Sequence, residues 1–314
     1  MSLIEKAAAK LKKNESLVER AAKKMAKPAE GEEKKDSAAA ESAPAAASST
    51  TSESSKTAQA PAEKKPSRKQ SRRVEIDMEH LKKQNILVVD GDHSQISEEF
   101  RIVKRSLLLN AFAKGEAAIP NGNIIMVTST QPEEGKTFCA ISLAMSMAME
   151  RDLTVLLVDA DVAKADVLKR MGLKAEKGLI DVIEDETLDL ADCLLRTNVP
   201  NLSLLPAGKK HKLTTELLAS ERMGELIDEI AKRYPDRVVI VDSPPVLANS
   251  SASVLALRVG QVLYIVEADR TREEELKEAL SMISSCEHIN LLLNKSRFSS
   301  GKKKFSSYYG YGYN

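Results

Sequence analysis

The stretch of residues 124–149 constrains the fold more than any other part of the chain. It begins with a short apolar run, continues through a polar segment that ends in Gly135, Lys136 and Thr137, and resumes as an apolar run from Phe138. This order predicts a buried strand, a loop and a helix. A Gly-Lys-Thr sequence between a strand and a helix is typical of a phosphate-binding loop, or P-loop.

The residues of this turn suit a nucleoside triphosphate. Gly135 lets the backbone N–H groups at a helix N-terminus approach phosphate closely. Lys136 would then reach the β- and γ-phosphates, and the Thr137 hydroxyl would bind Mg²⁺. The usual pattern opens with Gly five residues before Gly135, where this chain has Thr130, so the flanking strand and helix carry the assignment. The alternative is an ordinary turn between a strand and a helix.

Two further apolar runs end in aspartate. Residues 153–158 lead into Asp159 and Asp161, and residues 238–241 lead into Asp242. Parallel strands of this kind place their carboxyl ends at one ligand-binding edge of a sheet. An Asp at such an edge is placed to bind Mg²⁺ or to take a proton. The alternative for each is a helix cap.

The remaining pattern alternates between strands and helices. A helix is expected over residues 96–113, capped near Ser94 or Ser97, and Asn294 ends the last strand, where its amide is placed to read a purine edge. Alternation of this kind indicates an α/β fold, a doubly wound and mainly parallel sheet. Further strands are expected at 202–206, 262–266 and 290–293, and further helices at 215–233 and 272–284.

Composition divides the chain into four parts. Residues 1–26 predict an amphipathic helix with a basic face, which would lie on an anionic membrane, dock into another protein or pack on its own domain. Residues 27–73 are rich in Ala, Ser, Glu, Lys and Pro and predict a disordered linker. Residues 74–298 form the predicted P-loop domain, and residues 299–314 a flexible tyrosine-rich tail.

Charge and cysteine usage limit the partners and the compartment. The 47 basic and 46 acidic residues leave a net charge of +1, which gives no reason to expect a nucleic-acid partner. Cys139, Cys193 and Cys286 are widely spaced and predict buried thiols in a reducing compartment. No apolar run approaches the roughly 20 residues of a spanning helix. We therefore expect a cytoplasmic protein that reaches a membrane only through a partner or a surface helix.

The tail gathers most of the tyrosines of the chain. With glycine between them, these rings cannot build a core. Stacking on nucleic-acid bases is one use for such a cluster. Phenols beside a predicted ATP site more simply indicate phosphoryl acceptors. The tail tyrosines are Tyr308, Tyr309, Tyr311 and Tyr313.

Four segments together resemble one family. They are Glu-Glu-Phe-Arg-Ile-Val-Lys-Arg at 98–105, Pro-Glu-Glu-Gly-Lys-Thr at 132–137, Val-Leu-Leu-Val-Asp-Ala-Asp at 155–161 and Val-Asp-Ser-Pro-Pro at 241–245. The chain resembles, from about residue 81 to 298, the bacterial tyrosine kinases (BY-kinases), specifically soluble autokinases of exopolysaccharide loci that accompany exosortase-type genes.

The resemblance implies an ATP- and Mg²⁺-dependent protein-tyrosine autokinase that phosphorylates its tail tyrosines and so regulates exopolysaccharide synthesis or export. Lys136, Asp159 and Asp161 would be catalytic, with either Asp accepting the tyrosine proton. Mg²⁺ would be held by Thr137, Asp159 and Asp242. The nucleotide would be bound by Gln131, Glu133, Glu134, Gly135, Lys136, Thr137, Phe138 and Asn294.

The resemblance also implies partners. The family's Glu-x-x-Arg-x-x-Arg contact, through which subunits form a ring and offer tails to neighbouring sites, is matched by Glu98, Arg101, Lys104 and Arg105. A membrane-embedded polysaccharide co-polymerase, made as a separate chain, would recruit the kinase through residues 1–26. The homo-oligomeric ring and the co-polymerase are therefore the two expected protein partners.

Three positions depart from the family pattern. Glu133 stands where the family has Gly, at a place where positive φ or a close approach to phosphate favours Gly. Lys104 occupies the second Arg position of the contact motif, and Lys cannot form the same bidentate pair. Lys164 and Ala165 stand where Arg-Pro is common.

Two other functions compete with the kinase. A P-loop ATPase switch like the partition and division-site ATPases would carry a second P-loop lysine, at the position of Gln131 in this chain. A nucleotide-binding scaffold of a polysaccharide export complex would need no turnover, and Glu133 keeps this alternative open. Formation of phosphotyrosine would indicate the kinase, and phosphate release without phosphotyrosine the ATPase switch. Nucleotide binding without either product would indicate the scaffold.

Overall fold

The structure is a computed structural model and describes residues 72–86, 94–233 and 236–296. The predicted amphipathic helix at 1–26, nearly all of the predicted linker and the tail tyrosines lie outside the described residues. The predicted P-loop domain is therefore the part of the chain on which the following description rests.

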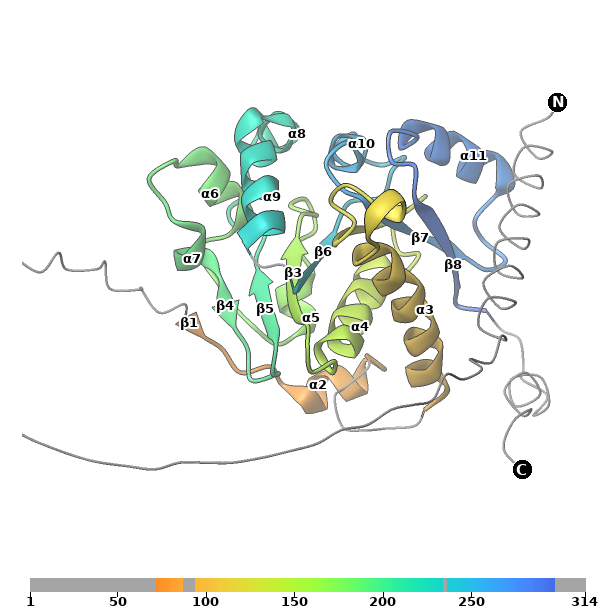
Figure 1. Cartoon of the computed structure of the whole chain (residues 1–314), viewed down its shortest axis with the longest axis horizontal. Coiled ribbons are helices and arrows are strands. Elements are labelled where there is room, and N and C mark those ends of the chain that lie inside the picture. The colour runs from red at the N-terminus through yellow and green to blue at the C-terminus, as the bar shows by residue number, and fades with distance from the viewer. Residues whose placement is uncertain (1–71, 87–93, 234–235, 297–314) are drawn as a thin grey trace, which may run out of the picture. The chain divides into compact units, whose positions relative to one another are not determined.

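One sheet of eight strands organises the described residues, in the order β1-β4-β5-β3-β6-β2-β7-β8 (Figure 1). Neighbouring strands are parallel except β4 and β5, which pair antiparallel. This confirms the predicted α/β fold with a mainly parallel sheet. The strands are β1 (Arg72–Arg73), β2 (Ile124–Ser129), β3 (Thr154–Asp159), β4 (Leu195–Arg196), β5 (Leu202–Leu205), β6 (Arg237–Asp242), β7 (Gln261–Glu267) and β8 (Ile289–Asn294).

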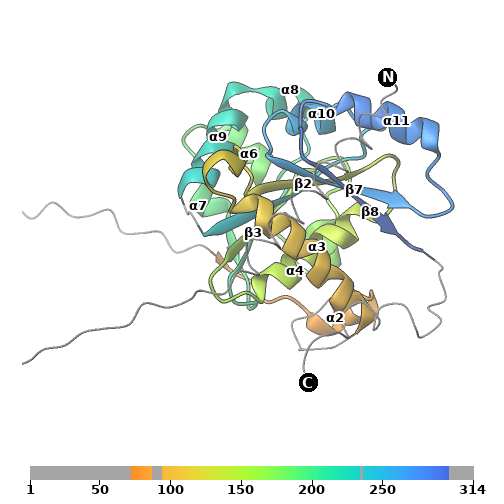
Figure 2. The same cartoon turned by 45° about the vertical axis from the view of Figure 1, so that its right-hand side comes forward.

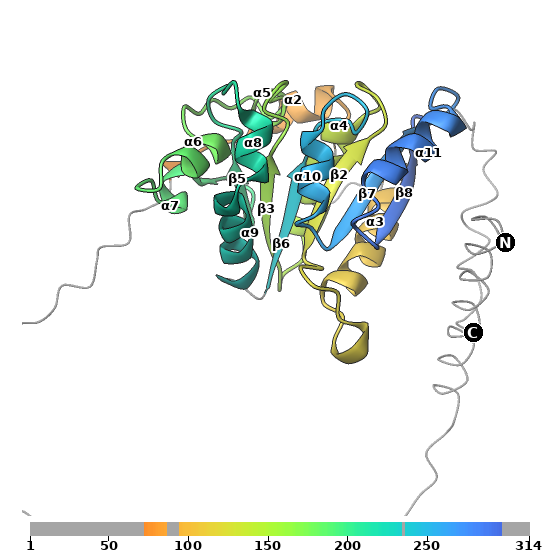
Figure 3. The same ribbon diagram turned by 90° about the horizontal axis from the view of Figure 1, so that it is seen from above.

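Helices cover both faces of the sheet, as Figure 3 shows from above. On one face lie α2, α3, α4 and α5, and on the other lie α6 to α11. The helices are α2 (Met78–Lys83), α3 (Gln95–Ala111), the 3₁₀ turn η1 (Gly115–Ala117), α4 (Lys136–Ala148), α5 (Val167–Arg170), α6 (Leu179–Glu184), α7 (Leu190–Cys193), α8 (Thr214–Ala219), α9 (Glu221–Arg233), α10 (Ser251–Ala256) and α11 (Glu273–Met282).

The central strand β2 shows why this sheet needs two helical layers. All six of its residues are buried, and successive side chains of a strand point to opposite faces. Ile124 and Met126 pack into the core under α6 to α11, whereas Ile125 and Val127 pack into the core under α2 to α5. A strand that is apolar at every position therefore requires cover on both sides.

The predicted helix over 96–113 is confirmed as α3, which packs against α4 (Figure 2). Ser94 is its N-cap, since the Ser94 hydroxyl accepts a hydrogen bond from the N–H of Ser97. Phe100 and Leu107 are buried, and Val103 packs against the same core. The apolar stripe of this helix therefore faces the domain.

The predicted helix over 215–233 is two helices, α8 and α9. Ser220 between them has extended backbone, with ψ of 158°, and its hydroxyl accepts a hydrogen bond of 3.2 Å from the N–H of Met223. Ser220 thus starts a new helix rather than continuing the first.

The described domain includes two residues of the predicted linker. Arg72 and Arg73, placed in the linker by composition, form β1 and pair with β4.

Cys139, Cys193 and Cys286 are buried and free, as predicted. Of the helices within the described ranges, none combines the length and the hydropathy needed to cross a bilayer.

Candidate nucleotide site

A cavity of about 750 Å³ opens at the carboxyl edge of the sheet, where β2, β3 and β6 end. Its size falls in the range of small-molecule sites. Of the residues predicted to bind nucleotide, the cavity is lined by Glu133, Gly135, Lys136, Thr137, Phe138 and Asn294. The structure therefore brings together residues that lie far apart in the sequence.

Gly135 forms the turn between the loop and α4. It is the N-cap residue of α4 with φ of 101°, a conformation that favours glycine. A Cβ atom at Gly135 would lie 2.1 Å from Nδ2 of Asn294. Both observations explain why glycine occupies this position in the P-loop.

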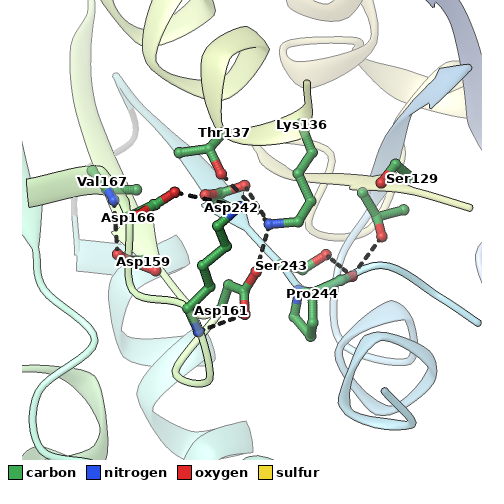
Figure 4. A network of polar contacts seen from close by, with 12 residues as sticks. Ser129, Lys136, Thr137, Asp159, Asp161, Asp166, Val167, Asp242, Ser243 and Pro244 are labelled. Atoms are coloured by element: carbon green, nitrogen blue, oxygen red, sulfur yellow. Dashed lines mark hydrogen bonds and ion pairs between the residues drawn. The ribbon is translucent and has the colours of Figure 1, made fainter. Parts of the chain in front are cut away.

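Lys136 lies among three carboxylates (Figure 4). Its Nζ is 2.5 Å from Oδ2 of Asp161 and 3.9 Å from Oδ1 of Asp242. Burial lowers the pKa of Lys136, but Asp242, Asp161 and Asp159 act the other way and the net pKa is raised. The ammonium group is therefore charged and directed toward the acidic side chains.

The carboxyl groups of Asp159 and Asp242 are buried but accept few hydrogen bonds. Burial raises the pKa of Asp242 to about 6, although Lys136 and the hydroxyl of Thr137 act to lower it. Burial and the charge of Asp242 raise the pKa of Asp159 to about 8, although the N–H of Val167 donates to its Oδ2. Oδ1 of Asp159 and both carboxylate oxygens of Asp242 have no hydrogen bond of normal geometry.

These unpartnered oxygens fit a hydrated divalent cation. A buried acceptor without a partner is costly, and Mg²⁺ is held by one or two carboxylates together with substrate phosphates and water. Within residues 72–86, 94–233 and 236–296, no group of three or more acidic, His or Cys side chains forms a complete metal cage. The residues Thr137, Asp159 and Asp242 therefore suit an ion that arrives with a phosphate ligand.

Gln131 and Glu134, predicted to bind nucleotide, do not line this cavity. The Glu134 side chain is buried, and its Oε2 accepts a hydrogen bond of 2.8 Å from the N–H of Gln131. Its Oε1 accepts a hydrogen bond from the hydroxyl of Thr271. The carboxylate of Glu134 is therefore used to fold the loop, and a nucleotide contact of Glu134 would come from its backbone.

Asn294 lines the cavity and also binds the P-loop. Its Nδ2 donates a hydrogen bond of 2.8 Å to the carbonyl of Glu134, so the amide nitrogen predicted to read a purine edge is occupied by the P-loop. Lys295, absent from the predicted site, donates from Nζ to the carbonyl of Glu133 at 2.7 Å. The sequence signal for Lys295 was its place directly after Asn294 at the end of β8.

The four residues of the predicted subunit contact on α3 differ in their surroundings. Glu98 and Arg101 form an ion pair and Arg105 is exposed, so these three remain predicted contacts. Lys104 instead docks on α4, where Nζ donates to the carbonyl of Ser146 at 3.0 Å and lies 2.6 Å from the carboxylate of Glu150. Its side chain is 12% exposed.

The chain is similar to a known domain family and to several known proteins. A family model described as an AAA domain matches residues 122–293. The tyrosine-protein kinase Wzc of Salmonella typhimurium is 30% identical over 232 residues, which cover 74% of this chain and 30% of that protein. The putative tyrosine-protein kinase CapB of Staphylococcus aureus is 26% identical over 229 residues, which cover 72% of this chain and 95% of that protein.

A solved structure agrees with these relatives. The kinase domain of the Escherichia coli tyrosine kinase ETK matches with a TM-score of 0.60 and 28% identity, covering 73% of this chain and 85% of that one. The chain spans 30% of the length of the Wzc proteins that it matches. The similarity therefore concerns only a part of those longer proteins.

Proposed function

Because the chain belongs to the AAA domain family, we propose that it binds ATP at the P-loop and transfers the γ-phosphoryl group to tyrosine hydroxyls. The observation that carries the proposal is the cluster of Lys136 with Asp159, Asp161 and Asp242 at the cavity. Several relatives with this domain are named tyrosine-protein kinases, which supports a tyrosine acceptor.

The P-loop residues bind and orient the triphosphate. Lys136 contacts Asp161, and a bound ATP would draw the ammonium group to the β- and γ-phosphates. Thr137, Asp159 and Asp242 would hold Mg²⁺, which when bound neutralises charge on the phosphates. The movement of Lys136 leaves the carboxylate of Asp161 free in the cavity.

Asp161 is the stronger candidate to accept the tyrosine proton. It lines the cavity, whereas Asp159 does not and is bound to the N–H of Val167. The phenol oxygen attacks the γ-phosphorus, the bond to the β–γ bridging oxygen breaks, ADP leaves and the phenol proton passes to Asp161. Asp159 is assigned to the cation.

We place the acceptors in the tail at Tyr308, Tyr309, Tyr311 and Tyr313. The products regulate exopolysaccharide synthesis or export. Subunits assemble as a ring through the α3 face of Glu98, Arg101 and Arg105. A membrane-embedded co-polymerase on a separate chain binds residues 1–26 and recruits this cytoplasmic kinase to the inner face of the membrane.

The fate of the γ-phosphate tests the proposal. Purified protein is incubated with Mg²⁺ and ATP labelled at the γ-position, and label is measured in phosphotyrosine and in free phosphate. We expect phosphotyrosine in the wild type and none in Lys136→Ala, with the exposed control Lys174→Ala unchanged. Free phosphate without phosphotyrosine would identify an ATPase switch instead, and nucleotide binding without either product a scaffold.

A further inference from the structure

Glu133 occupies a backbone conformation that suits glycine. Its φ is 72°, in the left-handed region that residues with a Cβ atom adopt at a cost. The residue lies in the P-loop two positions before Gly135 and lines the cavity. Some contact must therefore stabilise this conformation, because the side chain does not favour it.

The end of β8 supplies such contacts to two successive carbonyls. Lys295 donates from Nζ to the carbonyl of Glu133 at 2.7 Å, and Asn294 donates from Nδ2 to the carbonyl of Glu134 at 2.8 Å. Nζ of Lys295 also lies 3.0 Å from Oε2 of Glu267, the last residue of β7. The ammonium group, on a side chain that is 44% exposed, thus bridges the P-loop and the neighbouring strand.

The same network closes from the other side of the loop. The hydroxyl of Thr271 donates to the carboxylate of Glu134 and accepts a hydrogen bond of 2.9 Å from the N–H of Glu267. Glu267 therefore touches the loop by two routes, through Lys295 and through Thr271. A loop held at both ends by one strand pair has little freedom to change its peptide orientations.

Peptide geometry links these carbonyls to phosphate binding. In a trans peptide the C=O of one residue and the N–H of the next point in opposite directions. When Lys295 and Asn294 draw the carbonyls of Glu133 and Glu134 toward β8, the N–H groups of Glu134 and Gly135 turn the other way. Such N–H groups are the donors that a P-loop offers to phosphate.

We propose that Lys295 is a positioning residue that holds Glu133 in the left-handed conformation and thereby sets the P-loop for the phosphates of a nucleotide. The inference rests on the proposed nucleotide binding at this loop. It assigns to Lys295 the task that a glycine at position 133 would perform through its own conformational freedom. Lys295 is then needed because of Glu133.

A double-mutant cycle tests this dependence. The dissociation constant of a non-hydrolysable ATP analogue with Mg²⁺ is measured by calorimetry for the wild type, Lys295→Met, Glu133→Gly and the double variant. We expect Lys295→Met to weaken binding about tenfold when Glu133 is present, equivalent to about 1.4 kcal/mol. With Gly at position 133 the same substitution should weaken binding by about twofold or less.

The controls separate this role from simple loss of charge or of fold. Lys174→Met removes an exposed lysine that does not line the cavity and should leave the affinity unchanged. Lys295→Arg keeps a donor and should retain most of the affinity. Hydrogen exchange of residues 131–135 in the ligand-free protein should rise in Lys295→Met and not in Lys174→Met.

An equal loss of affinity in both backgrounds would mean that Lys295 acts on the nucleotide directly, which would overturn the inference. No loss in either background, or unchanged exchange of the loop, would overturn it as well. Because binding is measured without turnover, the result is independent of the kinase proposal. A protein that shows the predicted cycle but forms no phosphotyrosine would refute the kinase alone.

Discussion

Lys136 is surrounded by more carboxyl groups than it can pair with. Asp161 contacts it directly, and Asp159 and Asp242 are buried behind that pair with raised pKa values. Burying carboxylates without full hydrogen bonding is unfavourable. A bound divalent cation would supply the partner that these carboxylate oxygens need.

Gly135 offers a test of the loop at this scale. We expect Gly135→Ala to lower the free energy of unfolding by about 2 to 3 kcal/mol. The alanine would have to adopt a positive φ, and its Cβ would displace the side-chain amide of Asn294 that is hydrogen-bonded to the loop. Gly115 also has positive φ, but a Cβ there meets no atom within 4 Å. Gly115→Ala should therefore cost only about 1 kcal/mol.

Chemical denaturation of both variants measures the difference. If Gly135→Ala were no more destabilising than Gly115→Ala, the close approach of Asn294 to the loop would not hold in solution. Nucleotide affinity of Gly135→Ala should fall as well, since the start of α4 would shift.

The cysteines provide a pH-dependent prediction. Burial and the charge of Asp242 raise the pKa of Cys139 to about 12, and burial raises that of Cys193 to about 11. A raised pKa leaves less thiolate at pH 8 than a free cysteine has, and thiolate is the reactive form. Alkylation of the native protein at pH 8 should therefore be slow, and should become fast in denaturant. Rapid labelling of the folded protein would contradict the buried placement.

At the scale of elements, α3 has one face on the domain and one face exposed. Lys104 belongs to the first, since it bridges to the C-terminal part of α4 through Ser146 and to Glu150. Arg105, next in sequence, is exposed. Lys104 therefore holds α3 on α4, whereas the role of Arg105 as a subunit contact remains a prediction.

These roles predict different outcomes for neighbouring substitutions. Lys104→Ala should lower the free energy of unfolding by about 1 kcal/mol, because it removes a half-buried hydrogen bond and ion pair. Arg105→Ala should change it by less than about 0.5 kcal/mol. Urea denaturation measures both at a protein concentration where the chain is monomeric.

Sedimentation then separates assembly from folding. If the α3 face forms the ring, Arg105→Ala should reduce the oligomer without loss of stability. An Arg105→Ala protein that unfolds as easily as Lys104→Ala would show that the exposed placement is wrong.

The longer strands were predictable because each is a short apolar run, and β3, β6 and β8 also end in Asp or Asn. The two-residue strands β1 and β4 were not predicted. The prediction of one continuous helix over residues 215–233 was wrong because the apolar pattern continues across Ser220. The break shows only in the capping hydrogen bond that the hydroxyl of Ser220 accepts from the N–H of Met223. The purine-reading role predicted for Asn294 was incomplete for a similar reason. Its partner, the carbonyl of Glu134, lies 160 residues away, and no local pattern encodes that contact.

At the scale of the whole molecule, strand order builds the site. β3 and β6 are adjacent, and their register places Asp159 directly opposite Asp242, while β2 pairs with β6 on its other side. The sequence predicts that all three strands end at one edge, but not their order, because order depends on packing of the complete chain. The clustering of Lys136 with the three carboxylates follows from this order.

The most direct test of the central claim is the chemical state of the tail after reaction. Wild-type protein and Lys136→Ala are incubated with Mg²⁺ and ATP, digested, and their C-terminal peptides sequenced by tandem mass spectrometry. We expect phosphoryl groups on tyrosines among Tyr308, Tyr309, Tyr311 and Tyr313 in the wild type and none in Lys136→Ala. Tail peptides that stay unmodified in the wild type, or equal modification in both proteins, would contradict it.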